Sequence, residues 1–539
     1  MSLRKGLLLS SAALLLSFAS CKKYTELNPI NSLSESTAFT SPANIELVMA
    51  GVYNTAAVGS YNGGAGRGYP FGAASIEQAE MRGEDMVNLA TFYQLTYESL
   101  VDPTTANNVN MWVNLYALIN QCNVMIEGVK NASSSGIITA AVATQYEAEA
   151  RFLRALAHHE LVLDFCRPYV DGNGSSLGIP YRTVAVTSTT SVETEKSVGR
   201  GTVAEDYAKI LADLDFAETN LPATRASQLK ITRAVKGAAI ALKTRVKLHM
   251  NDFAGVITEG AKLGAATDGT TFTASSDFGS YALTATPDAP FAVTSGAGTA
   301  VTAEAIFSIE NSSAANGGTN GALPAMFGPA DKGARGLVAT SPNLYNASFW
   351  VSSDTRRSLM QVQQTTTGAK YYFNYKYRDY VNRSDYAPII RYAEVLLNVA
   401  EAYTRGSAVN TTRALNLLNA IRNRAVATAD RYTAASFAST DALTQAILNE
   451  RRIEFAGEGR RWPDITRLSK SNFAVTGGGV PAKLLVTDIL GDGSQYNIVT
   501  RPALTPNKAA LPYTDFHYIW PIPADETTRN PNIPQNPGY

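Results

Sequence analysis

Pairs of amphipathic helices are the feature that most constrains how this chain can fold. Apolar residues recur at alternating steps of four and three along seven segments, which places them on one face of an α-helix. These segments lie within residues 111–129, 152–166, 203–217, 235–249, 392–403, 418–425 and 443–447. Because one helical hairpin cannot cover its own apolar face, the pairs must stack on one another. The pattern predicts a mostly α-helical fold of stacked tetratricopeptide-like hairpins, with no fixed-period sequence repeat.

Composition excludes several classes of protein. The chain has 539 residues, of which 45% are hydrophobic and 17% charged, as expected for a globular protein. Lys and Arg together number 46, as do Asp and Glu, and zero net charge argues against a nucleic-acid-coating protein. Three cysteines exclude a disulfide scaffold, and four histidines leave little room for a histidine-rich metal site.

The first twenty residues have the pattern of a lipoprotein signal peptide. Arg4 and Lys5 precede an apolar run over residues 7–19, which is too short to span a bilayer as a helix. Small residues stand directly before Cys21. We therefore expect cleavage after residue 20, lipidation of the Cys21 thiol, and a body attached to the membrane by its lipid alone.

Beyond the signal peptide the composition predicts three regions. Residues 21–257 form an N-terminal helical region, and residues 258–340 a loop-rich insertion dominated by Gly, Ser, Thr and Ala. Within the insertion, residues 305–310 resemble a short strand. Residues 341–539 form a C-terminal helical region that ends in a proline-rich tail. Five prolines within residues 521–539 predict that the tail is extended or turning, without regular helix.

The sequence lacks the common catalytic signatures. His158, His159 and Glu160 resemble the start of a zinc-protease helix, but Leu163 stands where the second ligand should be. His159 and His249 lie on apolar helix faces and are expected to be hydrogen-bonded core residues. No phosphate-binding loop or nucleophile elbow is present.

No cofactor is expected. Asp488 and the Asp492-Gly493 pair resemble part of a calcium loop, but the intervening acids are absent, so structural calcium is a remote alternative. Cys122 and Cys166 lie on predicted buried faces, where we expect inert thiols; a disulfide between them stays open.

A charge-dense stretch, residues 450–467, carries Glu450, Glu454 and Glu458 at intervals of four among several arginines. This spacing predicts an ion-pair lattice that ties one helix to its neighbours. A carboxylate pair for glycosidase chemistry would also need a cleft and a defined separation, which nothing in the sequence indicates.

Four ordered motifs resemble the SusD/RagB family of Bacteroidetes surface lipoproteins. They are APIIRYAEVLLNVAEAY (387–403), ALNLLNAIRNRA (414–425), ILNERRIEFAGEGRRWPDITRL (447–468) and YIWPIPADETTRNPNIPQNPGY (518–539). The resemblance implies a body of four tetratricopeptide-like hairpins, a ligand face built from irregular insertions, and partnership with a SusC-like TonB-dependent transporter. It also implies a binding protein without catalytic activity, at the outer membrane and facing the cell surface.

A sugar offers an apolar C–H face and a rim of hydroxyls, so its site needs an exposed aromatic platform with polar neighbours. Trp350 is the foremost candidate because its ring has the largest stacking face. The alternative is that such rings fasten their loops to the body. The full set of candidates, all in glycine-rich or loop segments, is Tyr61, Arg67, Tyr69, Phe71, Phe92, Tyr93, Tyr345, Phe349 and Trp350.

These observations favour a protein that captures oligosaccharides and hands them to its transporter. A peptide-binding protein of the same family is the first alternative, since an extended groove with main-chain hydrogen bonding is compatible with the weakly patterned middle region. A glycoside hydrolase is a remote second alternative.

Overall fold

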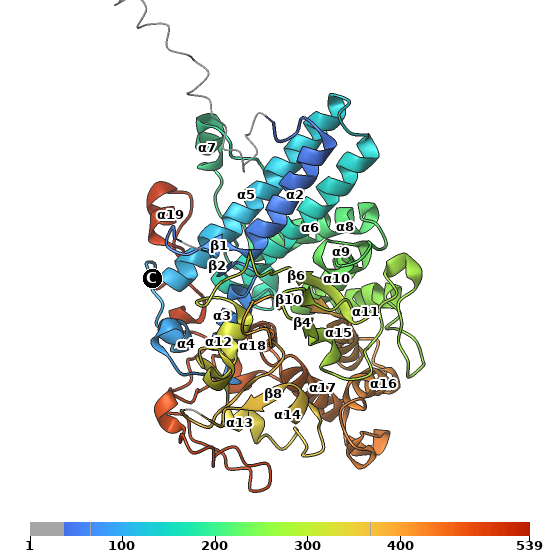
Figure 1. Cartoon of the computed structure of the whole chain (residues 1–539), viewed down its shortest axis with the longest axis vertical. Helices are drawn as coiled ribbons and strands as arrows, with labels where there is room; N and C mark the ends of the chain where they lie inside the picture. Colours follow the sequence, from blue (N-terminus) through green and yellow to red (C-terminus); the bar gives the residue numbers. More distant parts are fainter. Residues whose placement is uncertain (1–36, 65, 367) are drawn as a thin grey trace, which may run out of the picture.

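A computed structural model describes residues 37–64, 66–366 and 368–539. The predicted signal peptide and Cys21 lie outside the described residues. The predicted mostly α-helical fold is confirmed, with long helices stacked side by side and few, short strands (Figure 1). In chain order the longer helices are α2 (Pro42–Ala57), α5 (Ala106–Ser134), α6 (Ala140–Phe165), α8 (Val203–Asn220), α10 (Lys236–His249), α11 (Phe253–Lys262), α15 (Tyr392–Arg405), α16 (Thr411–Arg422) and α17 (Thr440–Glu454).

The long helices form one continuous stack. Helix α6 packs between α5 and α8, α10 contacts α8 and α11, and α15 lies against α11, α16 and α17. The turns α5–α6, α10–α11 and α15–α16 are short, so each pair is an antiparallel hairpin. Helix α8 begins with a capping box. The Thr202 hydroxyl accepts a hydrogen bond from the Glu205 N–H, and the Glu205 carboxylate accepts one from the Thr202 N–H.

Short elements fill the rest of the fold. The strands pair in antiparallel twos: β1 (Gly59–Ser60) with β2 (Gly66–Tyr69), β3 (Met86–Asn88) with β7 (Val338–Thr340), β4 (Val293–Thr294) with β5 (Gly298–Thr299), β6 (Ala305–Ile309) with β10 (Ala387–Arg391), and β8 (Gln361–Gln363) with β9 (Tyr372–Asn374). The short helices are α3 (Ala74–Arg82), α4 (Gln94–Tyr97), α7 (Thr189–Glu195), α9 (Leu229–Thr232), α12 (Leu323–Phe327), α13 (Pro342–Tyr345), α14 (Arg356–Leu359), α18 (Arg461–Leu468) and α19 (Ala524–Arg529).

Two of these strand pairs join distant parts of the chain. The predicted strand over residues 305–310 is confirmed as β6, whose residue Ile309 pairs with Ala387 of β10. In the second pair, Val87 of β3 is the partner of Ala339 of β7. The insertion is therefore held between the N-terminal and C-terminal regions.

The predicted ion-pair lattice is confirmed and lies almost entirely inside the protein. Glu454 of α17 pairs with Arg356 at 2.9 Å, Arg391 at 3.1 Å and Arg424 at 2.7 Å, and its side chain is 0% exposed. We call the whole set the buried ion network. It balances five bases against five acids: Arg356, Lys376, Arg391, Arg422 and Arg424 with Glu304, Asp354, Glu450, Glu454 and Glu458.

The proline-rich tail returns to the N-terminal helices. The Trp520 N–H donates to the Asp164 carbonyl at 2.9 Å, and the Asn536 side-chain amide donates to the Phe165 carbonyl at 2.8 Å. Figure 1 shows α19 beside α5 although almost 400 residues separate them. The expectation that the tail lacks helix is wrong for α19, because the segment between Pro523 and Pro531 has no proline, and Pro523 itself stands at the helix N-cap, where no donor is lost.

No helix within the described ranges has the length and apolar character that a membrane crossing requires.

Candidate functional site

Two of the predicted ligand-binding loops meet in the structure. The β1–β2 turn brings Tyr61 to 6.1 Å from the ring of Phe92, measured between ring centroids, and Phe92 stands 4.7 Å from Tyr93. The guanidinium carbon of Arg67 lies 4.3 Å from the centroid of Tyr61 and 5.6 Å from that of Phe92. We call Tyr61, Arg67 and Phe92, all partly exposed, the aromatic cluster.

Three of the predicted aromatics lie beneath this cluster. Tyr69, Phe71 and Tyr93 are each at most 2% exposed, so the expectation that their rings form an exposed platform is wrong. Tyr93 is buried because its segment packs on α3, where the Tyr93 hydroxyl donates to the carboxyl group of Glu77. Burial raises the pKa of Glu77 to about 8, partly offset by this hydrogen bond, so that the carboxyl is mostly protonated at neutral pH.

Helix α5 fixes the turn that carries Tyr61. The Asn62 N–H donates to the side-chain oxygen of Asn110 at 2.9 Å, and the Asn110 amide donates back to the Asn62 side chain at 2.9 Å. Farther along the turn, Gly68 has a φ of +71°, and a Cβ there would lie 2.9 Å from the carbonyl oxygen of Gly321. Only glycine allows this close approach of the insertion to the loop. The backbone that carries Tyr61 and Arg67 is therefore fixed by α5 on one side and by the insertion on the other.

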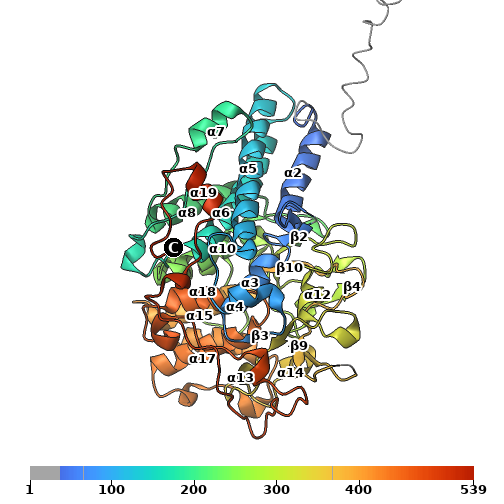
Figure 2. The ribbon, with the colours of Figure 1, turned by 90° about the vertical axis from the view of Figure 1, so that its left-hand side faces the viewer.

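A cavity of about 260 Å³ opens beside the turn that carries Phe92. Its walls include Thr91 and Gln94, which flank the Phe92–Tyr93 pair, and Leu485 from the C-terminal region. Figure 2 shows α3 and α4 next to each other in the middle of the molecule, where these segments meet. A stacked sugar ring at Phe92 would thus have a hollow next to it for a neighbouring residue of the glycan.

The third predicted group is not joined to the cluster by any ring contact among the described residues. Trp350 is 1% exposed and Tyr345 6%, while Phe349 is partly exposed, so the expectation of an exposed Trp350 ring is wrong. Their loop is covered because the Asn346 amide donates to the carbonyls of Gln495 and Pro502, about 150 residues away. Arg357 stacks on Trp350, with its guanidinium carbon 4.5 Å from the ring centroid.

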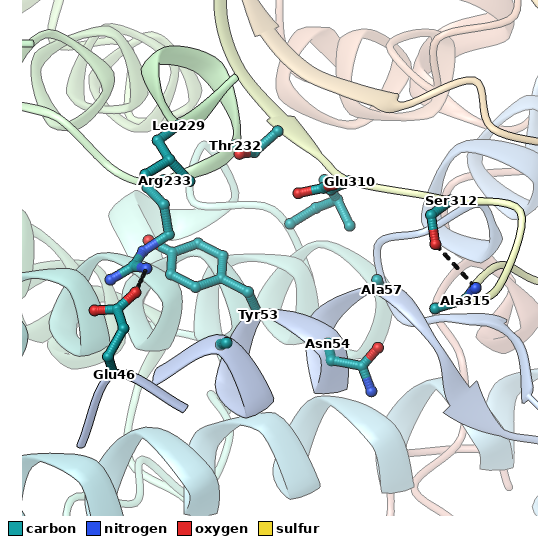
Figure 3. A pocket seen from close by; sticks show the side chains of 12 residues that line it. Glu46, Tyr53, Asn54, Ala57, Leu229, Thr232, Arg233, Glu310, Ser312 and Ala315 are labelled. Carbon is teal, nitrogen blue, oxygen red and sulfur yellow. Dashed lines mark hydrogen bonds and ion pairs between the residues drawn. The ribbon is translucent and has the colours of Figure 1, made fainter. Parts of the chain in front are cut away.

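A larger cavity, about 310 Å³, lies between α2 and the end of β6. Figure 3 shows its arginine, Arg233, aimed at Glu46, and the two groups are 2.6 Å apart. Arg233 also pairs with Glu149 at 2.6 Å, which accepts a hydrogen bond from Tyr53 as well. Arg233 donates through all three of its guanidinium nitrogens to Glu46 and Glu149, so these groups tie helices together. Sequence reasoning missed this cavity, since no spacing links its segments.

His159 and His249 are core residues, as predicted, and His158 is buried as well. His158 stacks on Tyr181 with ring centroids 3.7 Å apart, and His159 and His249 are buried side by side. One ring nitrogen of each member of that pair lacks a hydrogen-bond partner among the described residues, which departs from the expectation of full hydrogen bonding. Burial lowers the pKa of His159 to about 3, with Arg245 adding to the effect, so the ring is neutral at physiological pH.

The other reactive groups are equally enclosed or engaged. Cys122 and Cys166 are buried and free, and burial raises the pKa of Cys166 to about 12. Asp488 accepts the Leu485 N–H, and Asp492 accepts the Ser494 N–H. Within the described ranges, no three or more metal-binding side chains gather at one point.

Comparison with known proteins adds two family matches. A family model described as the SusD family matches residues 337–539, and one described as "starch-binding associating with outer membrane" matches residues 23–248. The SusD-like protein P2 of Formosa agariphila is 24% identical over 98% of both chains.

Solved structures show the same fold. A SusD superfamily protein from Bacteroides fragilis aligns with a TM-score of 0.71 and 25% identity, over 92% of this chain and 99% of that one. A laminarin-binding SusD-like protein of known structure aligns with a TM-score of 0.65 and 20% identity, over 93% of this chain and all of that one.

Proposed function

Because the chain belongs to the SusD/RagB family, matched in both its N-terminal and C-terminal regions, we propose that it captures oligosaccharides and passes them to a SusC-like TonB-dependent outer-membrane transporter. It acts without catalysis, and Cys21 carries the lipid that holds it at the cell surface. The description of the N-terminal family model and the laminarin-binding relative support a glycan ligand.

The observation that carries the proposal is the partly exposed pair of rings at Tyr61 and Phe92. Their centroids are 6.1 Å apart and the rings are inclined at 39°, so together they offer a shallow apolar surface to the C–H face of a sugar. The backbone of the Tyr61 turn is fixed by Asn110, so little conformational entropy is lost on binding. We therefore place the glycan at the aromatic cluster.

Removing either ring is expected to weaken glycan binding with little effect on stability. After a glycan array has identified a ligand, Tyr61→Ala and Phe92→Ala should each raise the Kd about tenfold in calorimetry, since one stacked ring contributes on the order of 1 kcal/mol or more. The matched control is Phe473→Ala, which removes another partly exposed ring that stands near an arginine, 5.8 Å from Arg405. Binding equal to wild type in both cluster variants would exclude this site.

The bound glycan is expected to stay intact. Incubation of the protein with its ligand for a day, followed by mass spectrometry, should yield no shorter products. Glu77 beneath the cluster is 1% exposed and held by Tyr93, and among the described residues the adjacent cavity is lined by a single acid, Glu98, whereas glycosidase chemistry needs a pair of carboxyl groups. Shorter products that persist after repurification would show that the protein is a hydrolase.

A further inference from the structure

The guanidinium of Arg67 is stacked on aromatic rings. Its guanidinium carbon lies over Tyr61 and within 6 Å of Phe92, yet among the described residues its N–H groups have no hydrogen-bond acceptor and no carboxylate. A guanidinium carries five donors in a rigid plane, and stacking on a ring fixes that plane without using any of them. The donors are therefore oriented and available.

A second stacked arginine, Arg357, differs from Arg67 because its N–H donors are used within the protein. It too lies over rings, 4.5 Å from Trp350 and 4.8 Å from Tyr345. However, it is buried, and its N–H groups donate to the carbonyls of Val351, Tyr345 and Trp350. Arg357 thus serves the fold, whereas the partly exposed Arg67 has donors that only solvent or a ligand can satisfy.

Arg67 also has no ion pair among the described residues. Glu77, the acid beneath the cluster, is largely protonated at neutral pH because burial raises its pKa to about 8, and its carboxyl is engaged by Tyr93. The polar neighbours that fix the turn, Asn62 and Asn110, are neutral amides. Within the described part of the chain, Arg67 therefore stands next to the two rings that would stack a sugar without a paired acid, while the one acid of the adjacent cavity, Glu98, accepts a hydrogen bond from Gln94.

We propose, resting on the glycan-binding function above, that the oligosaccharide taken by this site is anionic, and that Arg67 binds its carboxylate or sulfate group. The planar guanidinium matches two oxygens of either group, and such charge-assisted bonds are stronger than those to neutral hydroxyls. Tyr61 and Phe92 pack against the sugar ring, while Arg67 selects the charge.

The test compares charged and neutral sugars on the same variants. Calorimetry would use oligogalacturonates, oligoalginates and chondroitin sulfate oligosaccharides, each with its methyl-esterified or desulfated form, together with neutral malto-, laminari- and xylo-oligosaccharides. The charged form of the bound glycan should bind at least about tenfold more tightly than its neutral form, and this preference should decrease as salt rises. The uronate and sulfate arms identify which oxyanion is recognised.

Arg67→Gln is expected to weaken binding of the charged form about tenfold more than binding of the neutral form, which removes the preference, and Arg67→Lys, which keeps the charge but loses the planar fork of donors, should retain part of the preference. Arg431→Gln is the matched control, because it removes the same charge from an exposed arginine that has no ion pair among the described residues. Thermal melts should confirm that all variants are folded.

The two proposals fail in different ways. If wild type binds only neutral glycans, or binds both forms equally with Arg67→Gln unchanged, the anionic ligand is wrong while glycan binding stands. If wild type binds no member of the panel and no glycan on an array, the proposed function itself is overturned.

Discussion

Replacing Glu454 by alanine is expected to lower the free energy of unfolding by about 3–5 kcal/mol, because it leaves buried arginines without their counter-charge. Its carboxylate contacts Arg356, Arg391 and Arg424, and each of these is at most 6% exposed. Water cannot replace the lost partner at that depth. Urea denaturation followed by circular dichroism measures the effect.

The control for this change is Glu127→Ala, on an exposed position of α5 with no ion pair among the described residues. It should alter the free energy of unfolding by no more than about 0.5 kcal/mol. A loss below about 1 kcal/mol for Glu454→Ala would show that the buried ion network relaxes around the gap.

The effect of Glu454 should depend on pH in a defined direction. Burial opposes its ionisation, but Arg424, Arg391 and Arg356 outweigh burial and lower its pKa to about 2 from a usual 4.5. A depressed carboxyl pKa stabilises the fold fully above the unfolded value, and this contribution is lost as pH falls through the folded value. The stability difference between wild type and Glu454→Gln should therefore be constant from about pH 7 to 5 and shrink below about pH 4.

Trp350→Ala is expected to destabilise the protein by about 3–5 kcal/mol and to leave the affinity for glycan unchanged. The ring is 1% exposed and packs between Tyr345, at 5.9 Å, and Arg357, at 4.5 Å. Removing it creates a cavity and takes away one of the two rings on which Arg357 stacks. Affinity is measured by calorimetry at a temperature where a melt shows the variant to be folded.

Tyr61→Ala provides the complementary control, because its partly exposed ring should matter for the ligand and little for the fold. Loss of glycan affinity in a folded Trp350→Ala protein would place the site in the C-terminal region instead of at the aromatic cluster.

The helices could be predicted from the sequence because their signal is local. The apolar stripe over residues 111–129 falls within α5, and the stripe over residues 152–166 falls almost entirely within α6. The internal charges of residues 450–467 likewise predicted the ion pairs. Arg391, the partner of Glu454 and Glu458, could not be predicted, because it comes from another region of the chain and meets them only after folding. The same holds for Glu304, which pairs with Arg391 and Arg424.

The candidate site was predicted in part for the same reason. Aromatics in glycine-rich loops are visible in the sequence, but their exposure depends on what later covers them. Tyr93 is buried by α3, and the loop of Trp350 is covered by residues near 495 and 502, whereas Tyr61 and Phe92 stay at the surface. Composition alone does not distinguish these cases.

The return of the C-terminal tail to the first hairpin has a consequence for biogenesis. Trp520 and Asn536 bond to the end of α6, and Ala524 bonds to the carbonyl of Pro103 just before α5. Helices α5 and α6 are made early during translation, and they cannot form these contacts until residues 520–536 have been synthesised. The N-terminal half therefore reaches its final structure only together with the C-terminal tail, after the whole chain has been made.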